Sequence, residues 1–278
     1  MPRQLHCSVS QSLWDALHAR AQTTGQSVSH LVQKALAEFL GSEQHSMFQV
    51  STSGAVVQGV YEGCTTIGDL KRHGDFGLGT FDQLDGELIL LDGHCFRARS
   101  DGSVTEVPDT ALTPFATVTR FSADRKALLA AVESIDDLCQ RIDAHRTSPN
   151  LFAGVRVTGR FDRIMLRAAC KSVPGLPLVD ATATQSEFHL RDLTGTLVGF
   201  WSPAYASSIA ITGYHLHFIS DDRNHAGHVL GASGRDLVLA LHLEADLHLA
   251  LPENAAFLQA DLSGNPEAAL AVAEHARR

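Results

Sequence analysis

The chain has 278 residues and a mass of 29.9 kDa, which is enough for one large domain or two modest ones. Its 44% hydrophobic and 19% charged residues are typical of a globular protein and exclude disordered, collagen-like and disulfide-dense classes. The net charge of −9 argues against nucleic acid as the main partner of the whole chain.

Histidine is the anomalous residue type, since 15 of the 278 residues are histidines, and this favours metal or proton chemistry. The five cysteines are odd in number and form no CxxC pair. We therefore expect reduced thiols in a cytoplasmic protein, and neither a disulfide framework nor a cysteine zinc site. No apolar run is long enough to span a membrane and no signal-like start precedes one, so we expect neither a membrane anchor nor secretion.

The first 45 residues differ in pattern from the rest of the chain. Residues 3–9 alternate apolar and polar side chains and predict a short strand. Ser10 and Ser27 can each cap a helix that carries one apolar stripe, and Gly25 can end the first helix. A strand and two helices in about 40 residues cannot bury a core alone, so we expect this unit to pair with a copy of itself.

This order of elements, with the stretches S-V-S-Q-S-L-W-D-A-L and T-T-G-Q-S-V-S-H-L-V-Q-K-A-L-A-E-F-L, resembles the ribbon-helix-helix family of dimeric DNA-binding modules. By that resemblance Gln4, His6 and Ser8 would face DNA. Up to residue 45, however, three basic residues are balanced by three acidic ones, whereas a DNA-binding arm is normally basic. We expect residues 1–45 to be a dimerisation module that makes the protein a homodimer or higher homo-oligomer. DNA binding is the alternative.

Residues 46–278 form the second predicted domain, after a polar linker at 43–46. Its front half has strand-like runs separated by Asp-Gly turns, at 48–50, 55–61, 86–91 and 95–97. An apolar stripe predicts a helix over 124–143, and a proline at the first helical position predicts another over 266–278. Further strand-like runs lie at 155–166, 196–201, 208–211, 214–220, 228–230 and 236–240. The pattern predicts an α+β fold with a mixed, largely antiparallel sheet.

The strongest local signal for chemistry is a pair of histidines in one predicted strand, His215 and His217, followed by His228. Residues i and i+2 of a strand point to the same face about 6.5 Å apart, so two imidazoles can hold one ion. A turn at residues 221–224 would bring His228 alongside the pair. Three imidazoles and an open position describe a catalytic zinc site. The alternative is a polar strand face without a metal.

Several stretches in sequence order resemble the α-acetolactate decarboxylase family. They are G-F-W-S-P…H-A-G-H-V-L (199–230), F-Q-V-S-T…G-V-Y-E-G (48–63), H-G-D-F-G-L-G-T-F-D-Q-L-D-G-E-L-I-L-L-D-G (73–93), N-L-F-A-G-V-R-V-T-G-R-F (150–161) and L-P-E-N-A-A-F-L-Q-A-D-L (251–262). Together they cover nearly all of residues 47–278. Several long motifs in the same order are far more specific than a single H-x-H.

The resemblance implies that His215, His217 and His228 are zinc ligands. His225 stands where the family has no ligand, and we leave it out of the site. A glutamate within D-G-E-L-I matches Glu87, which the resemblance places beside the metal. Taken alone, a glutamate after an Asp-Gly turn would be interpreted as an exposed strand residue.

Two further catalytic residues follow from the resemblance alone. The family's active-site arginine corresponds to Arg167 in R-I-M-L-R, with Arg163 as the rival for this register. A second glutamate comes from the C-terminal tail, where spacing favours Glu274 in A-V-A-E-H, although Glu267 is close by. Either glutamate alone would be interpreted as a solvated helix residue.

The activity that the resemblance implies is Zn²⁺-dependent decarboxylation of 2-acetolactate to acetoin through a metal-stabilised enediolate. Such a reaction needs no organic cofactor, because the substrate's own ketone accepts the electrons that CO₂ leaves behind. The alternative is a transcriptional regulator that senses acetolactate through a decarboxylase-like domain and binds DNA through residues 1–45. A basic DNA-reading face would favour the regulator, and the segment lacks one.

Overall fold

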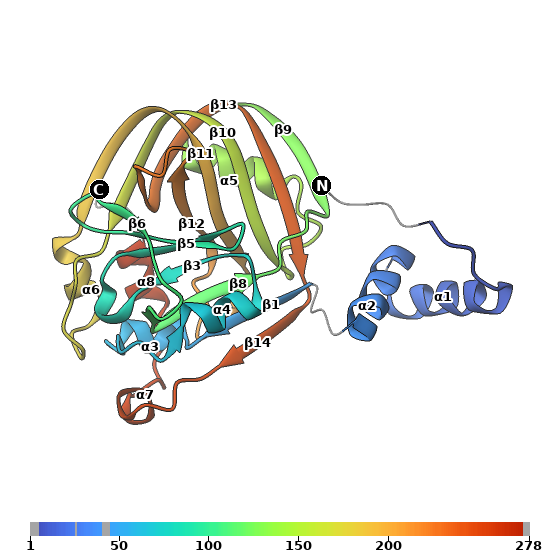
Figure 1. The fold of residues 1–278 in the computed structure, drawn as a ribbon, viewed down its shortest axis with the longest axis horizontal. Helices are drawn as coiled ribbons and strands as arrows, with labels where there is room; N and C mark the ends of the chain where they lie inside the picture. Colours follow the sequence, from blue (N-terminus) through green and yellow to red (C-terminus); the bar gives the residue numbers. More distant parts are fainter. Residues whose placement is uncertain (1–5, 26, 41–44, 275–278) are drawn as a thin grey trace.

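The computed structural model describes residues 6–25, 27–40 and 45–274, without the side chains of His30, Gln33, Glu38, Thr184 and Glu274. Two helices, α1 (Gln11–Thr24) and α2 (Val28–Leu40), stand to one side of a body built from two sheets (Figure 1). The predicted caps of α1 are confirmed, because Ser10 Oγ accepts a hydrogen bond from Leu13 N–H at 3.3 Å and Gly25 has a φ of 71°.

The strand expected at residues 3–9 lies partly outside the described residues, which begin at residue 6. Residues 6–9 carry no regular secondary structure in the single chain. A ribbon needs a second copy to pair with, so the ribbon-helix-helix interpretation stays a prediction.

The first sheet has seven strands, in the order β14-β1-β8-β3-β4-β5-β6. All neighbours in it are antiparallel except β1 and β14, which are parallel. The strands are β1 (Ser46–Val50), β3 (Phe76–Thr80), β4 (Glu87–Leu91), β5 (His94–Ala98), β6 (Val104–Glu106), β8 (Phe115–Thr119) and β14 (Asp246–Ala250). A separate small pair joins β2 (Thr65–Thr66) and β7 (Leu112–Thr113).

The second sheet contains long strands whose pairings close on themselves. Its members are β9 (Arg125–Val132), β10 (Phe152–Ala168), β11 (Ser186–Ser202), β12 (Gly213–Ser220) and β13 (Ala226–Glu244). The order is β10-β11-β12-β13-β9, and β13 also pairs with β10. Strand β13 therefore pairs with β10 along one edge. Along its other edge, the first residues of β13 pair with β12 and later residues pair with β9. This closure brings β10, β12 and β13 together at one place.

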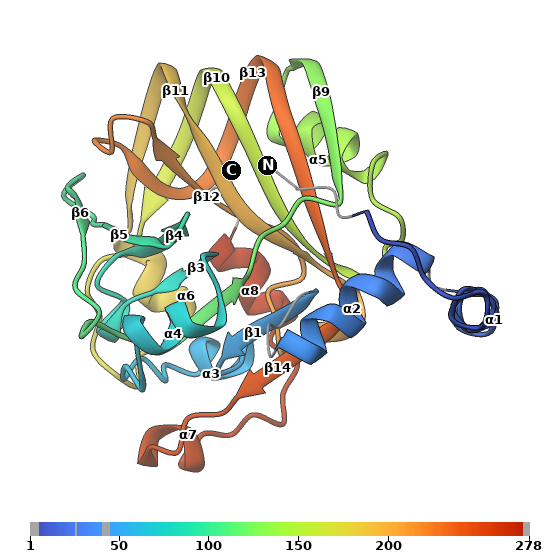
Figure 2. The same ribbon diagram turned by 45° about the vertical axis from the view of Figure 1, so that its right-hand side comes forward.

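Short helices connect and cover the sheets. They are α3 (Ser53–Val57), α4 (Ile67–His73), α5 (Ile135–Asp143), α6 (Leu178–Ala181), α7 (Ala255–Gln259) and α8 (Glu267–Glu274), with 3₁₀ turns at Asp82–Leu84, Thr182–Thr184 and Ala204–Ala206. Helices α3, α6 and α8 share one apolar cluster beside the sheets (Figure 2). No described helix is long and apolar enough to cross a membrane.

The predicted α+β class with largely antiparallel strands is confirmed, and three local expectations are wrong. Residues 124–143 form β9 and then α5, because β9 pairs with the free edge of β13 and Ser134 caps a new helix by accepting from Asp137 N–H. The run 55–61 begins as α3, capped by Thr52, and then continues without regular structure; residues 208–211 form no strand.

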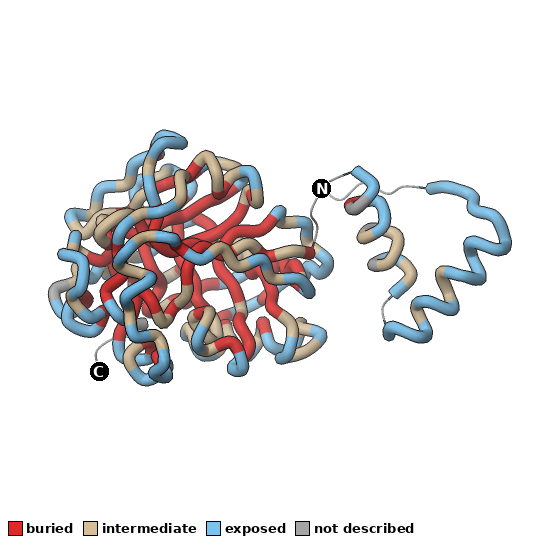
Figure 3. The backbone as a smooth tube through the Cα atoms, turned by 90° about the horizontal axis from the view of Figure 1, so that it is seen from below, coloured by how far each residue is buried: buried red, intermediate tan, exposed pale blue. Residues whose placement is uncertain are grey.

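Part of the core lies between the two sheets. One apolar cluster joins them, with Phe76 and Ile89 from the first sheet and Phe200 and Ile219 from the second. Buried residues concentrate in this body, whereas α1 and α2 are almost wholly exposed or intermediate (Figure 3). The apolar packing fixes the two sheets, and so it fixes the residues that project between them.

Candidate active site at a three-histidine cluster

The β12–β13 hairpin brings the three predicted ligand histidines together. His217 and His228 are directly paired across the hairpin, and His215 lies two residues earlier on β12. All three are buried, and their ligand atoms lie within 4.8 Å of one another. The ring centroids are 5.0 to 5.4 Å apart. His225 lies outside the cluster, next to the turn.

Local sequence explains why this hairpin forms. In the turn, Asp222 accepts hydrogen bonds from Ser220 Oγ at 2.6 Å and from Asn224 N–H at 3.0 Å, and these bonds lower the pKa of Asp222 to about 2. On the neighbouring strand β11, a side chain at Gly199 would lie 2.2 Å from the carbonyl oxygen of His215. Glycine therefore lets β11 approach β12 closely at this point.

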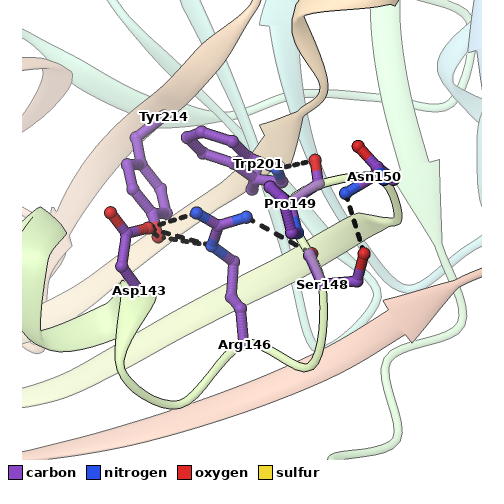
Figure 4. A network of polar contacts seen from close by, with 7 residues as sticks. All are labelled: Asp143, Arg146, Ser148, Pro149, Asn150, Trp201 and Tyr214. Carbon is purple, nitrogen blue, oxygen red and sulfur yellow. Dashed lines mark hydrogen bonds and ion pairs between the residues drawn. The ribbon is translucent and has the colours of Figure 1, made fainter.

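The start of β12 is held by a polar network shown in Figure 4. The Tyr214 hydroxyl accepts from Arg146 Nε at 2.9 Å and donates to Asp143 Oδ1. The Arg146 guanidinium also lies over the Trp201 ring, 3.6 Å from its centroid. Because Tyr214 precedes His215, this network restrains the strand next to the first ligand histidine.

The geometry around His217 fits a metal ligand. Its Nδ1 donates a hydrogen bond to the carbonyl oxygen of Leu88 on β4, at 2.9 Å, which leaves the lone pair on Nε2. That Nε2 is buried and has no hydrogen-bond partner among the described residues. Burial lowers the pKa of His217 to about 3 and that of His215 well below its usual value. Both rings are therefore neutral near pH 7, as metal ligation requires.

Glu87 lies beside the histidines, at the first position of β4, and is only 6% exposed. Its Oε2 is 3.6 Å from His217 Nε2, and its Oε1 accepts a hydrogen bond from Ala169 N–H at 3.1 Å. The turn before it aims the side chain inward: Gly86 has a φ of 101°, and Thr80 Oγ1 donates to the Gly86 carbonyl. The exposed position expected from local sequence alone is wrong, because Glu87 is buried. Its place beside a metal, which the family resemblance implies, stays a prediction.

Arg167 is the arginine that reaches this site. It pairs with His228 across β10 and β13, and it is 4% exposed. Its Nη1 lies 4.0 Å from Glu87 Oε1 and donates to Gln185 Oε1 at 3.2 Å. The rival Arg163 is exposed and donates to Ser233 in a different groove. Arg163 lies opposite Ser233 on β13, whereas Arg167 lies opposite His228, so only Arg167 is level with the histidines.

Comparison with known proteins agrees with this geometry. The family model for α-acetolactate decarboxylase matches residues 47–264. The chain belongs to the α-acetolactate decarboxylase family. It is 42% identical to the α-acetolactate decarboxylase of Methylococcus capsulatus over 85% of this chain and 91% of that protein. The enzyme of Bacillus subtilis strain 168 is 39% identical over 80% of this chain and 87% of that protein.

A solved structure supports the same assignment. The crystal structure of α-acetolactate decarboxylase from Bacillus subtilis strain 168 matches with a TM-score of 0.81 and 36% identity, over 83% of this chain and 100% of that chain. The present chain is therefore a decarboxylase, a carbon–carbon lyase. Helices α1 and α2 lie outside the range that the family model matches.

The site of this decarboxylase opens into a cavity with a polar end and an apolar wall. Glu87, Arg167 and His215 form the polar end. The apolar wall consists of Val56, Leu84, Phe115, Ala169, Leu178, Ile211 and Leu270. Local sequence did not predict that Gln185 would hold Arg167, because it comes from the irregular segment between β10 and β11. Local sequence also did not predict that the Leu88 carbonyl would accept from His217, since any residue type can supply a backbone carbonyl.

The C-terminal helix closes the apolar side of the decarboxylase cavity. Leu270 of α8 lines the cavity, and Ala273 packs into the cluster shared with α3 and α6. Glu274 is the last residue of α8, and its side chain lies outside the described residues, so its predicted place beside the metal stays a prediction. The rival Glu267 is exposed in the first turn of α8.

Proposed function

We propose that the chain converts 2-acetolactate to acetoin at a Zn²⁺ ion held by His215, His217 and His228. The observation that carries the proposal is a cluster of three buried imidazoles beside a cavity that a buried carboxylate, Glu87, and a buried guanidinium, Arg167, line together with His215. Relatives named α-acetolactate decarboxylase at 42% and 39% identity support the choice of substrate.

The donor set supports zinc as the metal. Neutral imidazole nitrogens are good ligands for Zn²⁺, and three of them leave a position open for substrate or water. The buried Nε2 of His217, without a hydrogen-bond partner among the described residues, is the kind of atom that a metal ion completes. Zn²⁺ bound there would supply a Lewis acid that stabilises negative charge on the substrate's oxygens.

In this proposal Arg167 binds the substrate's carboxylate through charge-assisted hydrogen bonds. The bond from the carboxylate carbon to the carbon bearing the hydroxyl breaks, CO₂ leaves, and the electron pair moves onto the neighbouring ketone to give an enediolate. The guanidinium then lies beside the new charge and stabilises it. Gln185 keeps the guanidinium in place by accepting from Nη1.

A glutamate then delivers a proton to the carbon that lost CO₂, which yields acetoin. Glu87 is placed for this role because Ala169 N–H fixes one oxygen while the other faces the histidine cluster. Glu274 is the alternative donor. The apolar wall of the cavity fits the two methyl groups of the substrate and keeps water from the reacting carbon.

We further propose that residues 1–45 associate two chains into a homodimer or higher homo-oligomer. Helix α1 has no buried residue, and Trp14 and Phe39 are 49% and 86% exposed. Other large apolar side chains exposed on these helices are Leu13, Leu36 and Leu40. Apolar helices without a core of their own favour pairing with a copy, whereas the balanced charge disfavours the DNA-binding regulator.

An acetoin assay tests the proposed reaction. Purified protein loaded with Zn²⁺ is expected to release CO₂ and acetoin in equal amounts from 2-acetolactate, and chelation is expected to stop both. A parallel assay with a substrate homologue that carries an ethyl group in place of a methyl group tests how large a group the apolar wall accepts. A metal-loaded protein that leaves 2-acetolactate unchanged would refute the proposal.

A further inference from the structure

A second group of ligand-type side chains lies at the far end of β13 from the active site. His45 precedes β1, Asp124 precedes β9, and His242 and Glu244 end β13. Ligand atoms of His45, Asp124 and His242 lie within 4.8 Å of one another. The proposed reaction uses none of these residues.

His242 is the central member of this group, which we call the β13-end cluster (His45, Asp124, His242 and Glu244). It is 1% exposed, and neither of its ring nitrogens makes a hydrogen bond of normal geometry among the described residues. Its Nδ1 lies 3.4 Å from Asp124 Oδ2, which is longer than the roughly 2.7–3.2 Å of a usual N–H···O bond. Two atoms bound to one Zn²⁺ at about 2.0–2.1 Å in a tetrahedron would lie about 3.3 Å apart, so the observed spacing suits a shared ion.

The other ring nitrogen of His242 lies close to a buried carboxylate. Its Nε2 lies 3.5 Å from Glu244 Oε1, and Glu244 is 1% exposed with neither oxygen hydrogen-bonded in the part of the chain that the structure describes. A histidine that ligates through one nitrogen commonly donates its other N–H to a carboxylate, which orients the ring. Glu244 thus suits the outer member of a carboxylate–histidine–metal arrangement.

Contacts with the backbone of Leu243 orient the side chains of His45 and Asp124. His45 Nδ1 contacts the Leu243 carbonyl oxygen at 2.8 Å, which fixes the orientation of the ring. Asp124 Oδ2 accepts from Leu243 N–H at 2.7 Å and lies 3.8 Å from His45 Nδ1. The His45 and His242 rings stack with centroids 4.8 Å apart. Asp124 is partly exposed, so solvent reaches the cluster from its side.

We propose that the β13-end cluster binds a second Zn²⁺ ion, with His45, Asp124 and His242 as ligands, water as the fourth ligand, and Glu244 orienting His242. Two imidazoles and a carboxylate form a donor set for a borderline cation such as Zn²⁺ rather than for Mg²⁺ or Ca²⁺. The ion ties the residue before β1 to the end of β13 and the start of β9, so its role is structural. It holds the point where the chain enters the decarboxylase domain.

Metal analysis of the full-length protein, loaded with Zn²⁺ and passed through a desalting column, tests the site. We expect two Zn²⁺ per chain in the wild type and one in Asp124→Asn and in His242→Gln. The exposed neighbour Asp246 provides the matched control, since Asp246→Asn keeps the whole cluster and is expected to retain two. Glu244→Gln should weaken binding at this site by about 10- to 100-fold.

The double variant His215→Ala/His217→Ala separates this site from the catalytic one. It is expected to keep one Zn²⁺ per chain and to gain several degrees in melting temperature when Zn²⁺ is added. This readout needs no substitution in the β13-end cluster and no catalytic activity. A wild type that holds one Zn²⁺, lost entirely in the double variant, would overturn the proposal, as would a melting temperature of the double variant that Zn²⁺ leaves unchanged.

Discussion

At the scale of single residues, Glu87 and Arg167 are expected to act on the reacting carbons and not on the metal. Glu87→Gln and Arg167→Ala should each keep the bound Zn²⁺ but lower acetoin formation by about 10²-fold or more, because proton delivery or carboxylate binding is lost. Metal content and initial rates measure the two effects separately. The exposed Glu133 supplies a matched control, Glu133→Gln, which should retain both. Wild-type turnover in both active-site variants would reject the assigned roles.

The buried histidines also make folding depend on pH. Burial lowers the pKa of His217 to about 3 in the folded protein, against 6.5 for an unperturbed histidine. Below pH 6.5 the unfolded chain therefore binds a proton that the metal-free folded protein does not. The free energy of unfolding should fall by about 1.4 kcal/mol per pH unit for such a histidine as the pH drops from 6.5 toward 3.

Urea unfolding of the metal-free protein at several pH values measures this dependence. The variant His217→Gln should show a shallower slope between pH 6.5 and 5, since one of the depressed histidines is gone. Equal slopes in the two proteins would contradict a neutral, buried His217.

Residue types and spacing identified the histidine cluster, because the i, i+2 pair and the turn before His228 are visible in the sequence. Arg167 was different. Strand alternation alone gives Arg163 and Arg167 the same face, and they differ in their partners on β13, which are Ser233 for Arg163 and His228 for Arg167. The register of β10 against β13 decides which arginine lies beside His228, and local sequence does not show this register. The burial of Glu87 likewise depends on a sheet-to-sheet contact.

At the scale of secondary-structure elements, α8 is expected to complete the cavity. Deletion from Asn265 onward removes Leu270 from the cavity wall and Glu274 with it, so acetoin formation should fall by about 10²-fold or more while Zn²⁺ stays bound. Deletion of residues 275–278 is the matched control and should leave the rate unchanged.

Two point variants separate the contribution of Glu274 from that of the cavity wall. Glu274→Gln tests the proton-donor assignment, and Leu270→Ala tests the wall alone. Full activity after removal of α8 would show that the helix has no part in the reaction.

The elements also show where sequence patterns mislead. The stripe over 124–143 suits a helix, yet β9 occupies its first half because β13 offers a long unpaired edge at Gly234–Leu241. Tertiary pairing overrides a local pattern when it satisfies a whole row of backbone groups. In the second half, Ser134 and the apolar positions Leu138 and Ile142 agree with the helix, and it forms.

At the scale of the whole molecule, the N-terminal helices are expected to affect assembly but not catalysis. A chain beginning at Met47 should keep its decarboxylase activity, because every proposed active-site residue lies beyond that point. It should form a smaller particle by light scattering, since the apolar surface around Trp14 and Phe39 is removed. An unchanged particle size would reject the dimerisation module.

The same truncated chain tests the regulator alternative. The intact protein is expected to bind duplex DNA weakly or not at all at physiological salt, because its first 45 residues carry no excess of positive charge. Tight, sequence-selective binding that disappears on truncation would instead favour the regulator.

The central claim is that decarboxylation takes place at the metal held by the three histidines. The most direct test is to measure acetoin formation on the double variant His215→Ala/His217→Ala beside the wild type, each with its bound Zn²⁺ counted after loading. We predict that the variant loses the catalytic ion, one Zn²⁺ per chain, and forms no acetoin above the spontaneous rate while its circular dichroism stays that of the wild type. A folded double variant that makes acetoin at the wild-type rate, or that binds as much Zn²⁺ as the wild type, would contradict the claim.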